Sequence, residues 1–181
     1  MEEMLTIFNH RVGLGYIIKL DSLDVARISV LAAKTSDSFD STPLYANYIW
    51  PGSIVMADFI QENPYLVKNK QILELGAGTG LPSLVSCKLH ASVVVCTDFP
   101  EPAVIENLSH LRKLNNCENM MVQSLEWGCD EHLEQLRNST LDGKGFDVVL
   151  LAELLWKDTY KLHNELAKSV RMLCANNGVV L

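Results

Sequence analysis

The sequence predicts an α/β fold in which helices cover both faces of a mostly parallel β-sheet. Three observations lead to this prediction. From residue 71 onward, short apolar runs alternate with segments of helical periodicity, which is typical of strand–helix–strand units. A glycine-rich turn follows the first apolar run at residues 76–80, and an acidic residue, Asp98, follows the second. Such turns lie at the carboxyl ends of parallel strands, where ligands bind.

Local apolar patterns predict the individual elements. Four runs that are short and apolar, as buried strands are, cover residues 71–75, 93–96, 120–122 and 146–151. Apolar residues at helical spacing mark helices around residues 54–60, 81–89, 102–111, 132–136 and 162–173. Pro64 ends the first helix. We expect a turn at residues 176–178 and a fifth strand beginning at residues 179–181.

Residues 1–42 are predicted to form an N-terminal extension, separate from a domain at residues 43–181. Two short apolar stretches within the extension, at residues 16–18 and 28–31, indicate a small leading hairpin or flap. Residues 34–43 are rich in Ser, Thr and Asp, which is typical of a loop.

The composition predicts a soluble globular domain and argues against a nucleic-acid-binding or membrane protein. The chain has 181 residues, of which 48% are hydrophobic and 20% charged, as in an ordinary soluble globular domain. Its net charge of −7 argues against a nucleic-acid partner, which needs a basic face, and is compatible with a basic protein partner. No apolar run approaches the length of a membrane span. The five cysteines, odd in number and widely spaced, favour a reducing compartment, so we expect the cytoplasm, with the nucleus as a further location.

No metal site is expected. Residues 129–132 include Cys129, Asp130, Glu131 and His132, all able to bind metals, but too few of them stand at ligand spacing. The nucleophile-elbow, zinc-protease and P-loop motifs do not occur in the sequence.

The glycine-rich turn reads ELGAGTG over residues 74–80. Glycines at this point let the backbone approach a ligand closely and turn into the next helix. The dinucleotide fingerprint G-x-G-x-x-G fails, because its sixth position, counted from Gly76, is Leu81. The pattern acid-x-G-x-G-x-G between a strand and a helix is instead typical of enzymes that bind S-adenosylmethionine. The alternative is a tight turn that binds no ligand.

Residues after the next three strands fit the same ligand. Asp98 stands about 20 residues beyond Gly76, where an acid accepts hydrogen bonds from ribose hydroxyls, although Asp is also a common helix N-cap. Trp127 can cover an adenine face by stacking, with a core position as the alternative. After the fourth strand, Ala152 leaves room for the cofactor, and Trp156 would wall the acceptor channel or belong to the core.

Four segments resemble the lysine-type protein methyltransferases, methyltransferase family 16 of the seven-β-strand superfamily: residues 48–51, 73–82, 125–128 and 151–156. Residues 97–101 are similar to a subset of that family named after nicotinamide N-methylation and associated with translation elongation factor 1A. The resemblance runs from residue 43 to residue 181. It implies a Rossmann-like S-adenosylmethionine methyltransferase sandwich.

The resemblance also implies roles for particular residues. The cofactor, S-adenosylmethionine, would be bound by Trp50, Glu74, Gly76, Ala77, Gly78, Asp98, Trp127 and Ala152. Glu153 and Trp156 are the candidate catalytic residues, and they stand where the family has Asp-x-x-Tyr, so the acid is kept and the phenol is lost. The superfamily sheet ends in a hairpin of strands six and seven. Either this chain is truncated before that hairpin or its remaining residues compensate for the missing strands; for a truncated sheet we expect reduced stability, dimerisation or lost activity.

We therefore expect an S-adenosylmethionine-dependent N-methyltransferase that transfers a methyl group in line to a neutral amine of a protein, on a lysine or at an N-terminus. A free lysine has a pKa near 10.4 and an α-amino group one near 7.7–8.0, so the N-terminal amine is the easier acceptor. Two alternatives stay open at this point: a nicotinamide-like small-molecule acceptor, and a module that binds cofactor or partner without catalysis. The oligomeric state is also left open.

Overall fold

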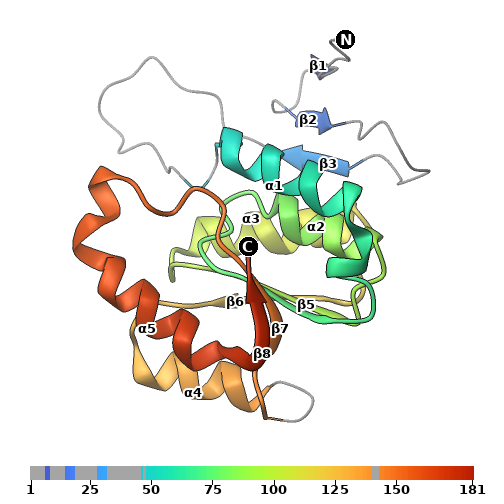
Figure 1. The fold of residues 1–181 in the computed structure, drawn as a ribbon. Helices are drawn as coiled ribbons and strands as arrows, with labels where there is room; N and C mark the ends of the chain where they lie inside the picture. Colours follow the sequence, from blue (N-terminus) through green and yellow to red (C-terminus); the bar gives the residue numbers. More distant parts are fainter. Residues whose placement is uncertain (1–6, 9–14, 19–27, 32–45, 47, 140–142) are drawn as a thin grey trace.

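The computed structural model describes residues 7–8, 15–18, 28–31, 46, 48–139 and 143–181 (Figure 1). Strands β1 (Ile7–Phe8), β2 (Gly15–Ile18) and β3 (Ile28–Leu31) form an antiparallel sheet of that order. The two apolar stretches of the extension thus lie in β2 and β3. The loop predicted at residues 34–43, and with it the boundary between the extension and the domain, lies outside the described residues.

The second sheet is parallel throughout, which confirms the predicted fold class. Its strands are β4 (Gln71–Glu74), β5 (Val93–Asp98), β6 (Met120–Ser124), β7 (Phe146–Leu150) and β8 (Cys174–Val180). They lie in the order β6-β5-β4-β7-β8. The chain runs outward from β4 to β6 and then returns to β7 on the other side of β4. The connections leaving β4 and β7 therefore diverge, and a ligand crevice is expected at this switch point.

Helices cover both faces of this sheet (Figure 1). On one side lie α1 (Pro51–Glu62), α2 (Leu81–Lys88) and α3 (Pro102–Leu114). On the other side lie α4 (Asp130–Asn138) and α5 (His163–Leu173). Two 3₁₀ turns, η2 (Pro64–Leu66) and η3 (Lys157–Leu162), precede β4 and α5. None of the helices in the described ranges is long and apolar enough to cross a membrane.

The hydrophobic core consists of two clusters, one on each face of the sheet, because successive side chains of a strand point to opposite faces. Ile72 and Val94 pack with α1, α2 and α3, whereas Leu73 and Val95 pack with α4 and α5. Successive strand residues point to opposite faces, and a parallel sheet is buried on both, so its strands appear in the sequence as continuous apolar runs. This arrangement explains why the strands were easy to predict.

The helix expected around residues 54–60 is confirmed as α1, which buries Ala57 and Ile60 and leaves the apolar Val55 and Phe59 68% and 43% exposed. One other expectation was wrong in detail. The turn expected at residues 176–178 lies inside β8, where the pairing register with β7 shifts between Phe146 and Val148. The shift accommodates extra residues without ending the strand. A Cβ on Gly178 would stand 2.8 Å from the Phe146 carbonyl oxygen, so the glycine there permits a close backbone approach.

Candidate active site

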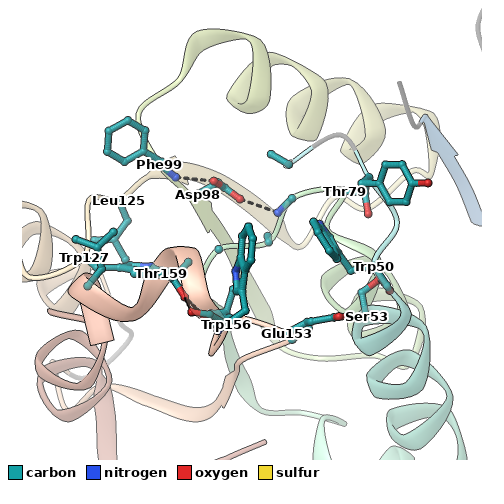
Figure 2. Close-up of a pocket in the computed structure, with 18 of the residues that line it drawn as sticks. Trp50, Ser53, Thr79, Asp98, Phe99, Leu125, Trp127, Glu153, Trp156 and Thr159 are labelled. Atoms are coloured by element: carbon teal, nitrogen blue, oxygen red, sulfur yellow. Dashed lines mark hydrogen bonds between the residues drawn. The ribbon is translucent and has the colours of Figure 1, made fainter. Parts of the chain in front are cut away.

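A cavity of about 380 Å³ lies at the carboxyl ends of β4, β5, β6 and β7 (Figure 2). Its walls come from the turns after these four strands, the segment before α1, and the η3–α5 segment. Nine of the ten predicted site residues line it: Trp50, Gly76, Ala77, Gly78, Asp98, Trp127, Ala152, Glu153 and Trp156. Glu74 is the exception. The fold therefore gathers residues from four separate turns into one pocket.

The glycine loop forms the floor of the cavity, and its glycines leave room there because they have no side chains. Gly76 and Gly78 adopt φ values of +59° and +54°, in the left-handed region that favours glycine. A Cβ on Gly76 would stand 2.7 Å from Leu154 and 3.1 Å from Trp127. A Cβ on Gly78 would stand 3.1 Å from the Ala46 carbonyl oxygen. Any larger residue at these positions would be strained and would push the opposite wall outward.

Glu74 lies behind the loop, not at the cavity wall. Its side chain is fully buried, and its Oε2 accepts hydrogen bonds from the backbone N–H of Ser83, at 2.9 Å, and from the Ser83 hydroxyl. Burial raises the pKa of Glu74 to about 8, against the lowering effect of the Ser83 hydrogen bonds. Glu74 thus holds the first turn of α2 in place, a positioning role in place of the cofactor contact that the sequence suggested.

Asp98 joins the end of β5 to the glycine loop. Its Oδ2 accepts a hydrogen bond from the Gly78 N–H at 2.6 Å, and its Oδ1 accepts one from the Phe99 N–H at 2.7 Å (Figure 2). Burial raises the pKa of Asp98, and the two backbone hydrogen bonds oppose that rise. A carboxylate has about four acceptor positions, so each oxygen keeps one for a ligand hydroxyl.

Aromatic side chains line the cavity. The ring centroids of Trp50 and Trp156 lie 5.6 Å apart, and those of Tyr48 and Trp50 lie 5.9 Å apart. Figure 2 shows Trp156 between Trp127 on one side and Trp50 on the other. The structure thus places Trp156 at the cavity wall, where the sequence had left a core position open. These rings give the cavity aromatic faces against which a planar ligand can stack.

Glu153 connects the end of β7 to the start of α1. Its Oε2 accepts a hydrogen bond from the Gly52 N–H at 2.6 Å, in the first turn of a helix whose N-cap residue, Trp50, makes no side-chain cap hydrogen bond. A Cβ on Gly52 would stand only 2.8 Å from the Glu153 carboxylate. Glu153 itself has φ +57°, uncommon for a residue other than glycine. The predicted catalytic acid therefore also caps a helix distant in sequence.

Sequence reasoning missed Thr159, which also lines the cavity. Its hydroxyl lies 2.6 Å from the Leu154 carbonyl oxygen, 3.3 Å from the Trp156 nitrogen and 3.1 Å from Nε2 of His163. It fixes the turn that carries Glu153 and Trp156. Thr159 is the third residue of η3 and accepts from the Trp156 N–H, as the third residue of a capping box does, but Trp156 stands where that motif has Ser or Thr, so the sequence carried no capping signal here. Among the described residues, no three His, Cys, Asp or Glu side chains are grouped as a metal site requires.

The raised pKa of Glu74 predicts a pH-dependent stability. The folded protein holds the Glu74 proton up to about pH 8, whereas the unfolded chain releases it near pH 4.5, so the free energy of unfolding falls as pH rises through this window. The contribution has a slope of up to about 1.4 kcal/mol per pH unit. Urea unfolding between pH 5 and 8 should show this fall in the wild type and lose it in Glu74→Gln. Equal slopes in the two proteins would contradict the assignment.

The cap on α1 predicts graded effects at Glu153. Glu153→Ala should lower the free energy of unfolding by about 0.5–2 kcal/mol, because the Gly52 N–H loses its acceptor. Glu153→Gln keeps an acceptor oxygen and should lose less than half as much. Glu118→Ala, which alters an exposed acid just before β6, is the matched control and should change nothing measurable. A loss in Glu153→Gln as large as in Glu153→Ala would argue for charge, not capping.

Comparison with known proteins places the chain in a family. The sequence pattern of the lysine methyltransferase family matches residues 38–181. Protein N-terminal and lysine N-methyltransferase efm7 of Schizosaccharomyces pombe is 37% identical over 139 residues, covering 76% of this chain and 54% of that protein. Its namesake from Neurospora crassa is 32% identical over 142 residues, covering 72% and 49%; the one from Candida glabrata is 30% identical over 170 residues, covering 90% and 63%.

Solved structures show the same fold. The Trypanosoma brucei PRMT1 enzyme–prozyme complex with AdoHcy superposes with a TM-score of 0.50 and 25% identity, covering 68% of this chain and 38% of that one. Precorrin-6y C5,15-methyltransferase from Geobacter metallireducens superposes with a TM-score of 0.51 and 16% identity, covering 71% and 58%. The chain spans about half the length of the first two curated relatives. On its sequence pattern and its fold, it belongs to the lysine methyltransferase family, methyltransferase family 16.

Proposed function

We propose that this chain binds S-adenosylmethionine in the cavity and transfers its methyl group to a protein amine, on a lysine or at an N-terminus. One observation carries the proposal: the side-chain-free glycine loop and the Asp98 carboxylate meet at one cavity, joined by the hydrogen bond from Gly78. Membership of the lysine methyltransferase family supports the reaction class. The names of the relatives, protein N-terminal and lysine N-methyltransferases, support the two acceptors.

The residues present fit the cofactor. Gly76 and Gly78 offer backbone without Cβ atoms to its amino-acid and ribose parts, as a closely approaching ligand requires. The free acceptor positions of Asp98 suit ribose hydroxyls. Trp127 offers an aromatic face to the adenine, and Ala152 adds little bulk beside it. When bound, S-adenosylmethionine supplies an electrophilic methyl group on a sulfonium.

The chain must supply the alignment and desolvation of the acceptor. Trp50 and Trp156 form an aromatic wall that excludes water and can hold an amine or ammonium group against ring faces. Glu153 caps α1 through Oε2, which leaves Oε1 to orient the acceptor amine. Only a neutral amine attacks, and at pH 7 about one lysine in 2500 is neutral, against roughly one α-amino group in ten. An N-terminal amine therefore needs less help from the site to lose its proton than a lysine does.

The acidic character of the chain fits a basic protein segment as acceptor. The net charge is −7, and complementary charge speeds the encounter with a basic partner. A cytoplasmic location, with the nucleus as a further one, suits such a partner and agrees with five cysteines outside a disulfide pattern.

Cofactor binding is tested by calorimetric titration of S-adenosylmethionine into the purified chain. We expect a dissociation constant on the order of micromolar for the wild type. Asp98→Ala should weaken binding by about tenfold to a hundredfold, because ligand hydroxyls lose a charged acceptor. Glu118→Ala should bind like the wild type. A folded wild type that binds no cofactor would overturn the proposal and leave an interaction module in its place.

The acceptor is tested with radiolabelled cofactor and two basic peptides, one with a free α-amine and no lysine, the other N-acetylated with one lysine. We expect methylation of both, faster for the free α-amine near pH 7. Its rate should rise with pH and level off near about pH 9, whereas the lysine rate should still rise toward about pH 10, because each rate follows the neutral fraction of its amine. Labelling of nicotinamide in place of both peptides would assign the site to a small-molecule acceptor.

A further inference from the structure

Two cysteines meet at the end of the sheet opposite the cavity. Cys87 lies in the last turn of α2, which leads into β5, and Cys117 lies in the turn between α3 and β6. Both therefore precede strands of the parallel sheet, whereas the cavity follows the strands. Both are free thiols in the same hydrophobic cluster, and their side chains are in hydrogen-bond contact with each other. Two thiols in contact can be oxidised to a disulfide without bringing distant parts of the fold together.

Polar contacts around the pair hold the two turns against each other. The Lys88 ammonium donates a hydrogen bond to the Asn115 carbonyl oxygen, and the Cys117 thiol donates to the same oxygen at 3.7 Å. The Arg112 Nε donates to the Cys117 carbonyl oxygen at 3.3 Å. The end of α2 is thus tied to the turn after α3 by contacts other than those between the sulfurs, and these contacts set the position of Cys87 relative to Cys117.

The two thiols differ in acidity. The hydrogen bond from Cys87 lowers the pKa of Cys117, and the nearby Lys88 and Arg112 cations add to this effect against the opposing effect of burial. The same hydrogen bond raises the pKa of Cys87, and burial raises it further. Because the thiolate is the form that reacts, Cys117 is the sulfur that attacks an oxidant first. Cys87 is then the neighbour in place to attack the oxidised sulfur.

The pair lies directly beneath the surface of the molecule. Cys87 is 7% exposed and Cys117 is 2% exposed, and the residues on either side of Cys117, Asn116 and Glu118, are exposed. Helix ends and surface turns open locally more readily than the strands of a core. Hydrogen peroxide is little larger than water, so a small opening of this turn admits it, whereas bulky thiol reagents need a larger one.

We propose that Cys87 and Cys117 are a modification site that hydrogen peroxide converts to a reversible disulfide. The Cys117 thiolate attacks one peroxide oxygen, the O–O bond breaks, and a sulfenic acid and one water form. The Cys87 sulfur then attacks the Cys117 sulfur, the S–S bond forms, and the sulfenic oxygen leaves as a second water. The two thiols lose two electrons, which reduce the peroxide. The proposal does not depend on the proposed function, because the pair lies away from the cavity.

The test treats the reduced, purified chain with a small excess of hydrogen peroxide, alkylates it after denaturation, and maps its peptides by mass spectrometry. The chain has five cysteines, so one disulfide should leave three that can be alkylated. The linked peptides should contain Cys87 and Cys117, and dithiothreitol should restore all five thiols. A disulfide that involves another cysteine in place of this pair, or Cys87 and Cys117 both still free after the other cysteines are oxidised, would overturn the proposal.

Serine variants test the order of the two steps. In Cys87→Ser, Cys117 has no partner and should be oxidised alone, to a sulfinic acid that adds two oxygens to its peptide. In Cys117→Ser, Cys87 should stay a free thiol under the same treatment. Cys129→Ser, which removes a partly buried cysteine before α4, is the matched control and should form the same disulfide as the wild type. Equal oxidation of the remaining thiol in both variants would contradict the assigned order of attack.

Thermal unfolding gives a readout that needs no variant and so stands even where a serine variant fails to fold. The disulfide would close a loop of about 30 residues, which restricts the unfolded chain. The thermal midpoint of the oxidised wild type should therefore exceed that of the reduced protein by roughly 5–10 °C. A lower midpoint after oxidation would show that the bond strains the native fold, and would overturn the inference that the fold is built to accept it.

Discussion

The site depends on the way in which the ends of β4 and β5 are tied together. The Gly78 N–H donates to Asp98 at 2.6 Å, and the Ala77 N–H donates to the Thr97 carbonyl oxygen at 2.9 Å. The Thr97 hydroxyl donates to the Glu74 carbonyl oxygen at 2.7 Å. Because these bonds link the glycine loop to the neighbouring strand, the loop and the acid at the end of β5 hold one geometry before any ligand binds. Preorganised groups of this kind lower the free-energy cost of binding.

The opposite wall is held by a second long-range tie, the hydrogen bond from the Gly52 N–H to Glu153. The left-handed backbone of Glu153 costs on the order of 1 kcal/mol, and a charge-assisted hydrogen bond to a helix terminus offsets a cost of that size. The same backbone turn lets Leu154 pack over Gly76, so the two walls meet at the floor of the cavity. The site therefore lies where α1, the sheet and the turn after β7 contact one another.

Four of the acidic side chains that line the cavity or lie behind it differ in burial and in hydrogen-bond partners, and therefore in their chemistry. Glu74, fully buried, has a pKa of about 8 and is largely protonated at neutral pH. Asp98 accepts two backbone N–H groups, and Glu153 accepts one at a helix start. Glu165 carries a buried oxygen without a partner in the described part of the chain. A cationic sulfonium ligand suits an acidic lining.

The sequence by itself determined the alternating α/β order, the parallel sheet, the glycine loop and the acid after the second strand, because each depends on residues close together along the chain. Only the tertiary structure decided what joins residues far apart: Glu153 capping α1, Glu74 turning away from the cavity toward Ser83, and Glu165 meeting the turn after β6. The tertiary structure also decided that β8 continues across residues 176–178, where local preference predicted a turn. Pairing with β7 outweighs that preference. Local patterns record backbone conformation and burial, whereas the direction of a polar side chain is set by partners that only folding brings near.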